Sequence, residues 1–130
     1  MSMRDLATTR ASVLLGTGAS DEIKAEVIAT MGAIDPAAYR CGAAAVWLAD
    51  QRTRAAAIDV PTLVMVGEED SITPPALSRA LADLVGSAAL RPPPVTLHTI
   101  PHAGHLANLE QPAAFNHAID RFLRATEDGA

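Results

Sequence analysis

The chain is 130 residues long, with 49% hydrophobic and 19% charged residues and a formal net charge of −5. This length allows one domain with a sizeable core, and the composition is typical of a packed globular protein. The negative charge and the aromatic content of 3% argue against nucleic-acid binding, which needs basic patches or stacking surfaces. Because the apolar runs are far shorter than a membrane span, we expect a cytoplasmic protein without membrane or nucleic-acid partners.

The first half of the chain predicts helices. Residues 1–19 are weakly patterned, and their glycine pair indicates a helix end and a turn, because the third glycine of a dinucleotide-binding loop is missing. Residues 20–34 and 35–49 each begin with a capping residue, a serine and an aspartate, and 51–57 predict another helical turn. Cys41 is the only cysteine, so an internal disulfide is excluded, and we expect a small buried side chain rather than a catalytic thiol.

The second half alternates strands and helices. Residues 62–66 form an apolar run between a proline and a glycine, which is typical of a buried central strand, and 95–100 alternate as a second strand. Thr73 before a proline predicts the start of a helix, and 111–124 carry apolar residues at helical spacing. A right-handed crossover makes the two strands parallel, so the loops that follow them open at one edge of the sheet. The sequence therefore predicts an α/β fold.

Candidate catalytic residues follow both strands. Glu68, Glu69 and Asp70 come directly after the first strand, and His105 follows the second. A carboxylate that orients an imidazole is part of a nucleophilic catalytic triad, so we expect Asp70 and His105 to meet. Gly104 permits the close backbone approach that a tight site loop needs. Glu68 and Glu69 remain alternatives for the acid.

Other polar residues fit simpler roles. His98, His102 and His105 have a spacing that suggests a zinc site, but His98 lies in a predicted strand and no fourth ligand clusters nearby. We therefore expect ordinary strand and loop histidines, with no metal ion and no cofactor. Asn116 and His117 are expected on the solvated side of the last helix.

Two motifs carry a resemblance to a known family. The run Pro-Thr-Leu-Val-Met-Val-Gly-Glu-Glu-Asp-Ser-Ile-Thr-Pro-Pro and the later run Pro-His-Ala-Gly-His-Leu-Ala-Asn-Leu-Glu-Gln-Pro-Ala-Ala-Phe resemble the carboxyl-terminal half of an α/β-hydrolase. Within that superfamily, they are most similar to the 3-oxoadipate enol-lactonase-like esterases. The resemblance implies a partial α/β-hydrolase fold. Residues 1–56 would form a helical cap-like segment, and residues 57–130 would form the last two parallel strands of the core with their helices.

The same resemblance implies roles for individual residues. By matching position, Asp70 is the triad acid, in preference to the two glutamates before it, and His105 is the base. Tyr39 and Trp47 fall in the cap segment that roofs the pocket in relatives, where they are either core residues or, for Trp47 in particular, substrate contacts. Glu110 is expected to be a capping or supporting acid rather than a catalytic one.

The nucleophile of this family is missing from the chain. Members carry a Gly-x-Ser-x-Gly elbow, and no pair of glycines here brackets a serine at that spacing. Ser20 comes nearest but lacks the second glycine and leads into a helix. The resemblance thus implies a hydrolase of small carboxylic esters or lactones, to which this chain supplies the Asp and His of the triad. The alternative is a non-catalytic binding or assembly module. In either case we expect a homo-oligomer or association with a missing amino-terminal half.

Overall fold

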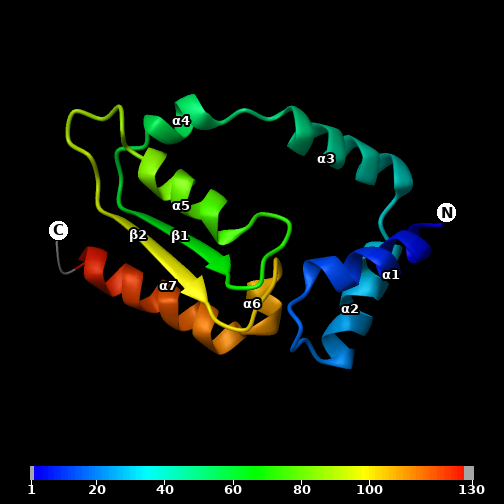
Figure 1. Cartoon of the computed structure of the whole chain (residues 1–130). Coiled ribbons are helices and arrows are strands. Elements are labelled where there is room, and N and C mark those ends of the chain that lie inside the picture. The colour runs from blue at the N-terminus through cyan, green and yellow to red at the C-terminus, as the bar shows by residue number, and fades with distance from the viewer. Residues whose placement is uncertain (1, 128–130) are drawn as a thin grey trace.

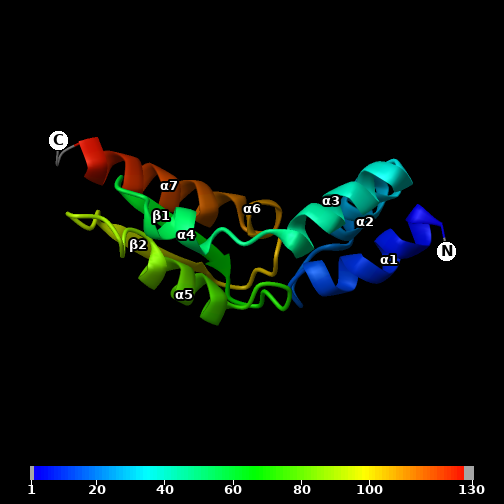
Figure 2. The same cartoon turned by 90° about the horizontal axis from the view of Figure 1, so that it is seen from above.

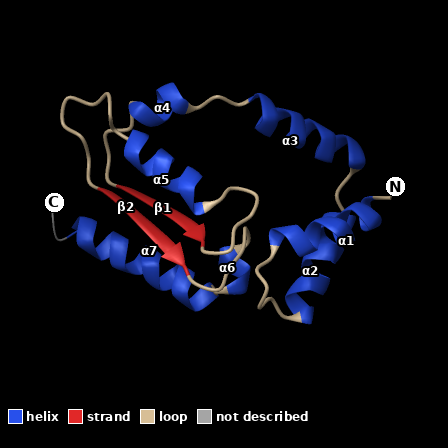
Figure 3. Ribbon diagram, viewed as in Figure 1, coloured by secondary structure: helices blue, strands red, loops and turns tan. Residues whose placement is uncertain are grey.

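A computed structural model of the chain describes residues 2–127. Its elements follow in the order α1 (Met3–Leu14), α2 (Asp21–Gly32), α3 (Pro36–Leu48), α4 (Arg52–Ala56), β1 (Thr62–Gly67), α5 (Pro75–Leu84), β2 (Val95–Ile100), α6 (Ala107–Glu110) and α7 (Pro112–Glu127). Figures 1 and 3 show helices in the first half and the two strands in the second. None of the described helices is both long enough and apolar enough to cross a membrane.

The two strands form the centre of the second half. β1 and β2 are parallel, in a register that pairs Thr62 with Val95 and Gly67 with Ile100. The crossover helix α5 covers one face of the sheet and α7 covers the other, which Figure 2 shows from above. Under α7, Ile100 is fully buried together with Ala118 and against Phe115. The predicted parallel pairing is confirmed, and it places the loops after β1 and β2 at the same edge.

A helical hairpin lies beyond that edge. α1 and α2 pack together around a core that includes Leu14, Leu15 and Val27. Helix α1 was not predicted, because the face that it buries includes Ala7 and Ala11, and such small side chains give little periodic signal. Its start is fixed by a capping box in which the side chains of residues 2 and 5 satisfy each other's backbone N–H groups.

Helix α3 lies apart from the rest of the chain. In Figure 1 it lies above the hairpin of α1 and α2, and the connector that follows it leads to α4 on the side of the sheet. None of its residues is buried, and Val46, Trp47 and Leu48 are 76%, 87% and 85% exposed. The prediction of a buried Cys41 is therefore wrong: its side chain is exposed, because no described layer packs on its side of this helix.

Candidate active site

Asp70 and His105 meet at the carboxyl edge of the sheet. Asp70 lies three residues after β1 ends and is 6% exposed, whereas His105 lies in the loop after β2. The Oδ2 atom of Asp70 is 3.0 Å from Nδ1 of His105. The predicted contact between the two side chains is confirmed, and it follows directly from the parallel pairing of the strands.

The carboxylate of Asp70 is held by its own loop. Its Oδ1 accepts hydrogen bonds from the backbone N–H groups of Ile72 and Thr73, both at 2.9 Å, and its Oδ2 accepts one from the Thr73 hydroxyl at 2.8 Å. Burial would raise the pKa of Asp70, but the hydrogen bonds from Thr73, His105 and Ile72 outweigh it and hold the pKa below its usual value. The carboxylate is therefore charged at neutral pH.

Thr73 has a different role from the one that its sequence context predicts. We expected it to cap the next helix, but α5 begins at Pro75 and Pro74 precedes it as the N-cap without a side-chain bond. The Thr73 hydroxyl instead bonds Asp70 and lies 3.3 Å from Nδ1 of His105. No pattern of apolar residues signals this second hydrogen-bond partner of the acid.

His105 is fixed through its backbone and free at one ring nitrogen. Its backbone N–H donates to the carbonyl of Leu14 at 2.7 Å, which ties the loop to the end of α1. Within the described part of the chain, Nε2 has no hydrogen bond, and the side chain is 35% exposed. When Nδ1–H donates to Asp70, the neutral ring presents Nε2 as an acceptor. This arrangement allows the ring to take a proton from a group placed next to Nε2.

The other two acids of the loop point elsewhere. Glu69 accepts hydrogen bonds from the backbone N–H and the hydroxyl of Thr17 at 2.7 and 2.9 Å, and these bonds lower its pKa. Glu68 accepts the backbone N–H of His102 at 3.2 Å. Of the three candidates, Asp70 is the carboxylate that touches the imidazole of His105.

A cavity opens beside His105. It is an open cavity of about 760 Å³, bordered by residues of α1, α3 and the loop after β1. Its lining comprises Arg10, Ile34, Ala38, Tyr39, Gly42, Ala43, Val46, Trp47, Ile72, Thr73 and His105. The size is within the range of small-molecule sites. Tyr39 and Trp47 thus border the same space as the histidine, and a substrate contact by Trp47 stays a prediction.

Comparison with known proteins decides the family. A model of the alpha/beta hydrolase family matches residues 3–118. The chain belongs to the α/β-hydrolase family. The 3-oxoadipate enol-lactonase 2 of Acinetobacter baylyi is 32% identical over 76 residues, which are 58% of this chain and 26% of that protein. The predicted partial α/β-hydrolase fold is confirmed by the solved structures that the chain resembles.

Two of these structures illustrate how much of the fold is present. A thermophilic esterase from Thermogutta terrifontis, solved with malate bound, superposes with a TM-score of 0.81 at 25% identity, covering 94% of this chain and 44% of the esterase. CarC, a serine hydrolase involved in carbazole degradation, gives a TM-score of 0.70 at 24% identity, covering 94% and 47%. This α/β-hydrolase chain therefore spans less than half the length of the solved structures that it matches.

No serine among the described residues forms a hydrogen bond with His105. Ser20 accepts the backbone N–H of Ile23 as the N-cap of α2, and Ser71 donates to the carbonyl of Val13. The Thr73 hydroxyl lies on the Nδ1 side of the ring, where the acid sits, and not at Nε2. These hydroxyl groups therefore have structural partners rather than the position of a nucleophile.

Glu110 links the segment after α1 to the histidine loop of this hydrolase chain. Its carboxylate accepts the backbone N–H of Gly16 at 2.6 Å and that of Gly104 at 2.9 Å. Both glycines are buried, so each N–H would be left without a partner if the carboxylate were lost. The expectation of a supporting acid is consistent with this geometry.

We predict that Glu110→Ala lowers the free energy of unfolding by about 2 kcal/mol or more, because two buried donors lose their acceptor. Glu110→Gln keeps one carbonyl oxygen and should fall between the wild type and Glu110→Ala. Urea unfolding at one fixed protein concentration measures the difference. Glu26→Ala, at an exposed acid of α2, is the matched control and should change little. Equal stability of Glu110→Ala and the control would show that the two hydrogen bonds of the Glu110 carboxylate do not stabilise the fold.

Close backbone packing at the site requires glycine at position 67. A Cβ atom there would overlap the carbonyl oxygens of Ala103 and Gly104 in the histidine loop. We predict that Gly67→Ala destabilises the chain by about 3 kcal/mol, since backbone atoms cannot move aside as a flexible side chain can.

Gly42 provides the matched control for that substitution. A Cβ at Gly42, inside α3, meets nothing within 4 Å. Gly42→Ala should therefore stabilise the helix by up to about 1 kcal/mol. Thermal unfolding of both variants checks the pair. A Gly67→Ala variant as stable as Gly42→Ala would show that the histidine loop does not pack as described.

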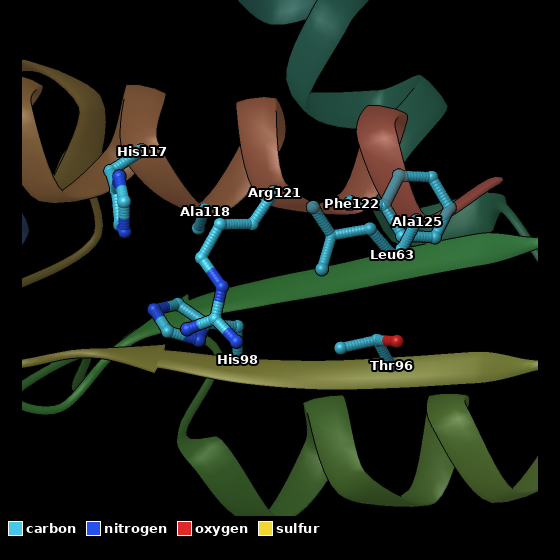
Figure 4. Close-up of a pocket in the computed structure, with 8 residues that line it drawn as sticks. All are labelled: Leu63, Thr96, His98, His117, Ala118, Arg121, Phe122 and Ala125. Carbon is cyan, nitrogen blue, oxygen red and sulfur yellow. The ribbon is translucent and has the colours of Figure 1, made fainter. Parts of the chain in front are cut away.

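A second cavity, of about 200 Å³, lies away from this site. Figure 4 shows it between α7 and the strands, with Arg121 reaching from α7 toward His98 on β2. His98 thus faces a different space from His105, and the described residues contain no cluster of three or more metal-ligating side chains. Asn116 and His117 are exposed on α7, as predicted.

Proposed function

We propose that this chain supplies the acid and the base of a Ser-His-Asp triad in a hydrolase of carboxylic esters or lactones. The observation that carries the proposal is the buried carboxylate of Asp70, held by its own loop and placed 3.0 Å from Nδ1 of His105. In this proposal the serine comes from a segment outside the 130 residues. The α/β-hydrolase family and the coverage of less than half of the matched structures support it.

The geometry accounts for the proton transfers of such a reaction. His105 would take the serine proton at Nε2 as the serine oxygen bonds to the carbonyl carbon, and Asp70 would stabilise the imidazolium that forms. The imidazolium would then return the proton to the departing alkoxide, which leaves an acyl-enzyme. Water would then bond to the acyl carbon as it gives a proton to Nε2. The imidazolium would return that proton to the serine oxygen as the bond between this oxygen and the acyl carbon breaks, which releases the carboxylic acid and restores the serine.

The relatives guide the substrate class. One relative is an enol-lactonase and another is an esterase, and hydrolysis of either bond passes through the same kind of tetrahedral intermediate. We propose that the cavity beside His105 receives the substrate and that residues 1–56 act as its helical cap, with Trp47 in contact with the ligand. The substrate is a small molecule, because the cavity has about 760 Å³.

A non-catalytic module is the second candidate. It is favoured by one observation, that no serine among the described residues forms a hydrogen bond with His105. Under this alternative the cavity would still bind a ligand, but no covalent acyl-enzyme would form in any assembly that contains the chain.

The isolated chain gives a first test of the hydrolase proposal. Without a nucleophile or an oxyanion hole, a triad keeps only residual catalysis. We therefore predict that the 130-residue chain hydrolyses p-nitrophenyl acetate no faster than its His105→Ala variant. A clear excess over that variant would show that the chain contains its own nucleophile, and the proposed division of the triad would have to be abandoned.

A further inference from the structure

Arg10 stands out among the residues around the large cavity. It lines the cavity from α1, together with His105 and Trp47. Its Nε atom is buried and has no hydrogen-bond partner among the described residues. The ion pairs of the same residues do not include it. A buried donor on a charged group is costly to leave unpaired, so the Nε–H of Arg10 lacks an acceptor that would offset its burial.

The described residues do not supply that acceptor. The residues that line the cavity include no carboxylate. The acids of the neighbouring loops are engaged elsewhere: Asp70 with His105, Glu69 with Thr17, and Glu110 with two backbone N–H groups. The cavity therefore presents one cation in a lining of mainly apolar and aromatic side chains.

We propose that Arg10 binds the anionic group, a carboxylate, of the ligand that enters this cavity. A guanidinium matches a carboxylate with two parallel N–H···O bonds, which are stronger and more directional than neutral hydrogen bonds. Tyr39, Val46 and Trp47 would contact the apolar body of the same ligand. If the chain is part of the proposed hydrolase, the substrate is an ester or lactone that also carries a carboxylate; this part of the inference rests on the proposed function. Arg10 then determines specificity by orienting that substrate toward His105.

The test uses binding and needs no turnover. Phenylacetate, which has a carboxylate and an aromatic ring, is titrated into the ¹⁵N-labelled 130-residue chain. The Nε–H of Arg10 and the indole N–H of Trp47, the only tryptophan, report the complex as separate NMR cross-peaks. Both should shift together. Phenylacetamide has the same shape without the charge and should bind at least about tenfold more weakly, since it loses the charge-assisted pair.

Two variants separate a specific site from general attraction. Arg10→Gln should weaken phenylacetate binding about tenfold and leave phenylacetamide binding unchanged. Arg54→Gln removes the same charge from an exposed position on α4 and should leave both affinities unchanged. If phenylacetate bound Arg10→Gln as tightly as the wild type, or if the wild type did not distinguish the acid from the amide, the inference would be overturned.

The binding test can fail or succeed independently of the hydrolase proposal. Preserved carboxylate binding in a chain that never yields an active hydrolase would overturn the hydrolase proposal and leave the anion site intact. An active hydrolase that prefers uncharged esters, with no response of the Arg10 cross-peak to phenylacetate, would support the hydrolase proposal and overturn the anion site.

Discussion

In an enzyme completed by a segment with a Gly-x-Ser-x-Gly elbow, His105→Ala is expected to abolish ester hydrolysis, and Asp70→Asn to lower kcat by about 10⁴-fold. The first change removes the proton acceptor of the reaction. The second keeps the shape of the acid but loses the charge that stabilises the imidazolium and selects the tautomer with a free Nε2. Substrate binding should survive both changes, because Asp70 lies behind the ring and is buried.

Glu69→Gln is the matched control for that experiment. It removes one carboxylate charge one residue from Asp70, but Glu69 bonds Thr17 and not the imidazole. Steady-state kinetics with p-nitrophenyl acetate should show Glu69→Gln within a few-fold of the wild type. If Glu69→Gln or Glu68→Gln were more damaging than Asp70→Asn, the assignment of the acid would be wrong.

The pKa of Asp70 sets the pH range in which its charge stabilises the fold. The folded pKa lies below the usual 3.8, so folding favours the ionised form. The stabilisation is present above about pH 4 and is lost as the pH falls through the folded pKa. Asp70→Asn should therefore be less stable than the wild type at pH 7, and the difference should shrink as the solution is acidified below pH 4.

The second large effect concerns assembly: we predict that the isolated 130-residue chain is not a monomer. Within the described residues the sheet has only β1 and β2, so each strand leaves one edge unpaired. Two strands are too few for an independently stable sheet, and an unpaired edge of an apolar strand is a template for another strand.

Exposed apolar side chains also support the prediction that the chain associates. Leu77 and Leu81 on α5 are 58% and 44% exposed, and Trp47 and Leu48 on α3 are more exposed still. Leu77 and Leu81 lie one turn apart on the same face of α5, and an exposed apolar face of this kind is usually covered by a partner. We expect it to be covered by a second copy or by the remainder of the hydrolase fold.

Light scattering coupled to size exclusion at micromolar concentration measures this prediction. The expected mass is at least twice 13.5 kDa, or a mixture of larger species that shifts toward a defined complex when the missing half is added. A monomer of 13.5 kDa that unfolds cooperatively would show that the chain closes its own core, and the interpretation as part of a larger sheet would fail.

Much of the carboxyl-terminal half of the fold could be predicted from the sequence. The strand at residues 62–66 has an apolar run with clear boundaries, and neighbouring strands of one sheet that are joined by a crossover helix run parallel. That rule brings Asp70 to His105 without any knowledge of the coordinates. The positions of these residues in the chain therefore contained the central feature of the site.

Other features left no such trace. The buried face of α1 includes alanines, so its periodicity is weak, and Cys41 is exposed because α3 lacks a covering layer, which no local pattern reveals. The contacts of Glu69 with Thr17 join segments 52 residues apart in the sequence. The Nε atom of Arg10 is buried without a partner among the described residues, which only the folded chain can show.

The most direct measurement for the central claim is to locate the nucleophile by covalent labelling. A serine-reactive fluorophosphonate is added to the chain alone and to the enzyme completed with the missing half, and the labelled peptide is identified by mass spectrometry. We predict no label on the 130 residues in either sample. In the completed enzyme we predict a label on the elbow serine of the added half, which His105→Ala in this chain removes. A label on any serine of the 130 residues that depends on His105, or a labelled elbow serine that is indifferent to His105→Ala, would contradict the claim that this chain supplies the acid and base of a shared triad.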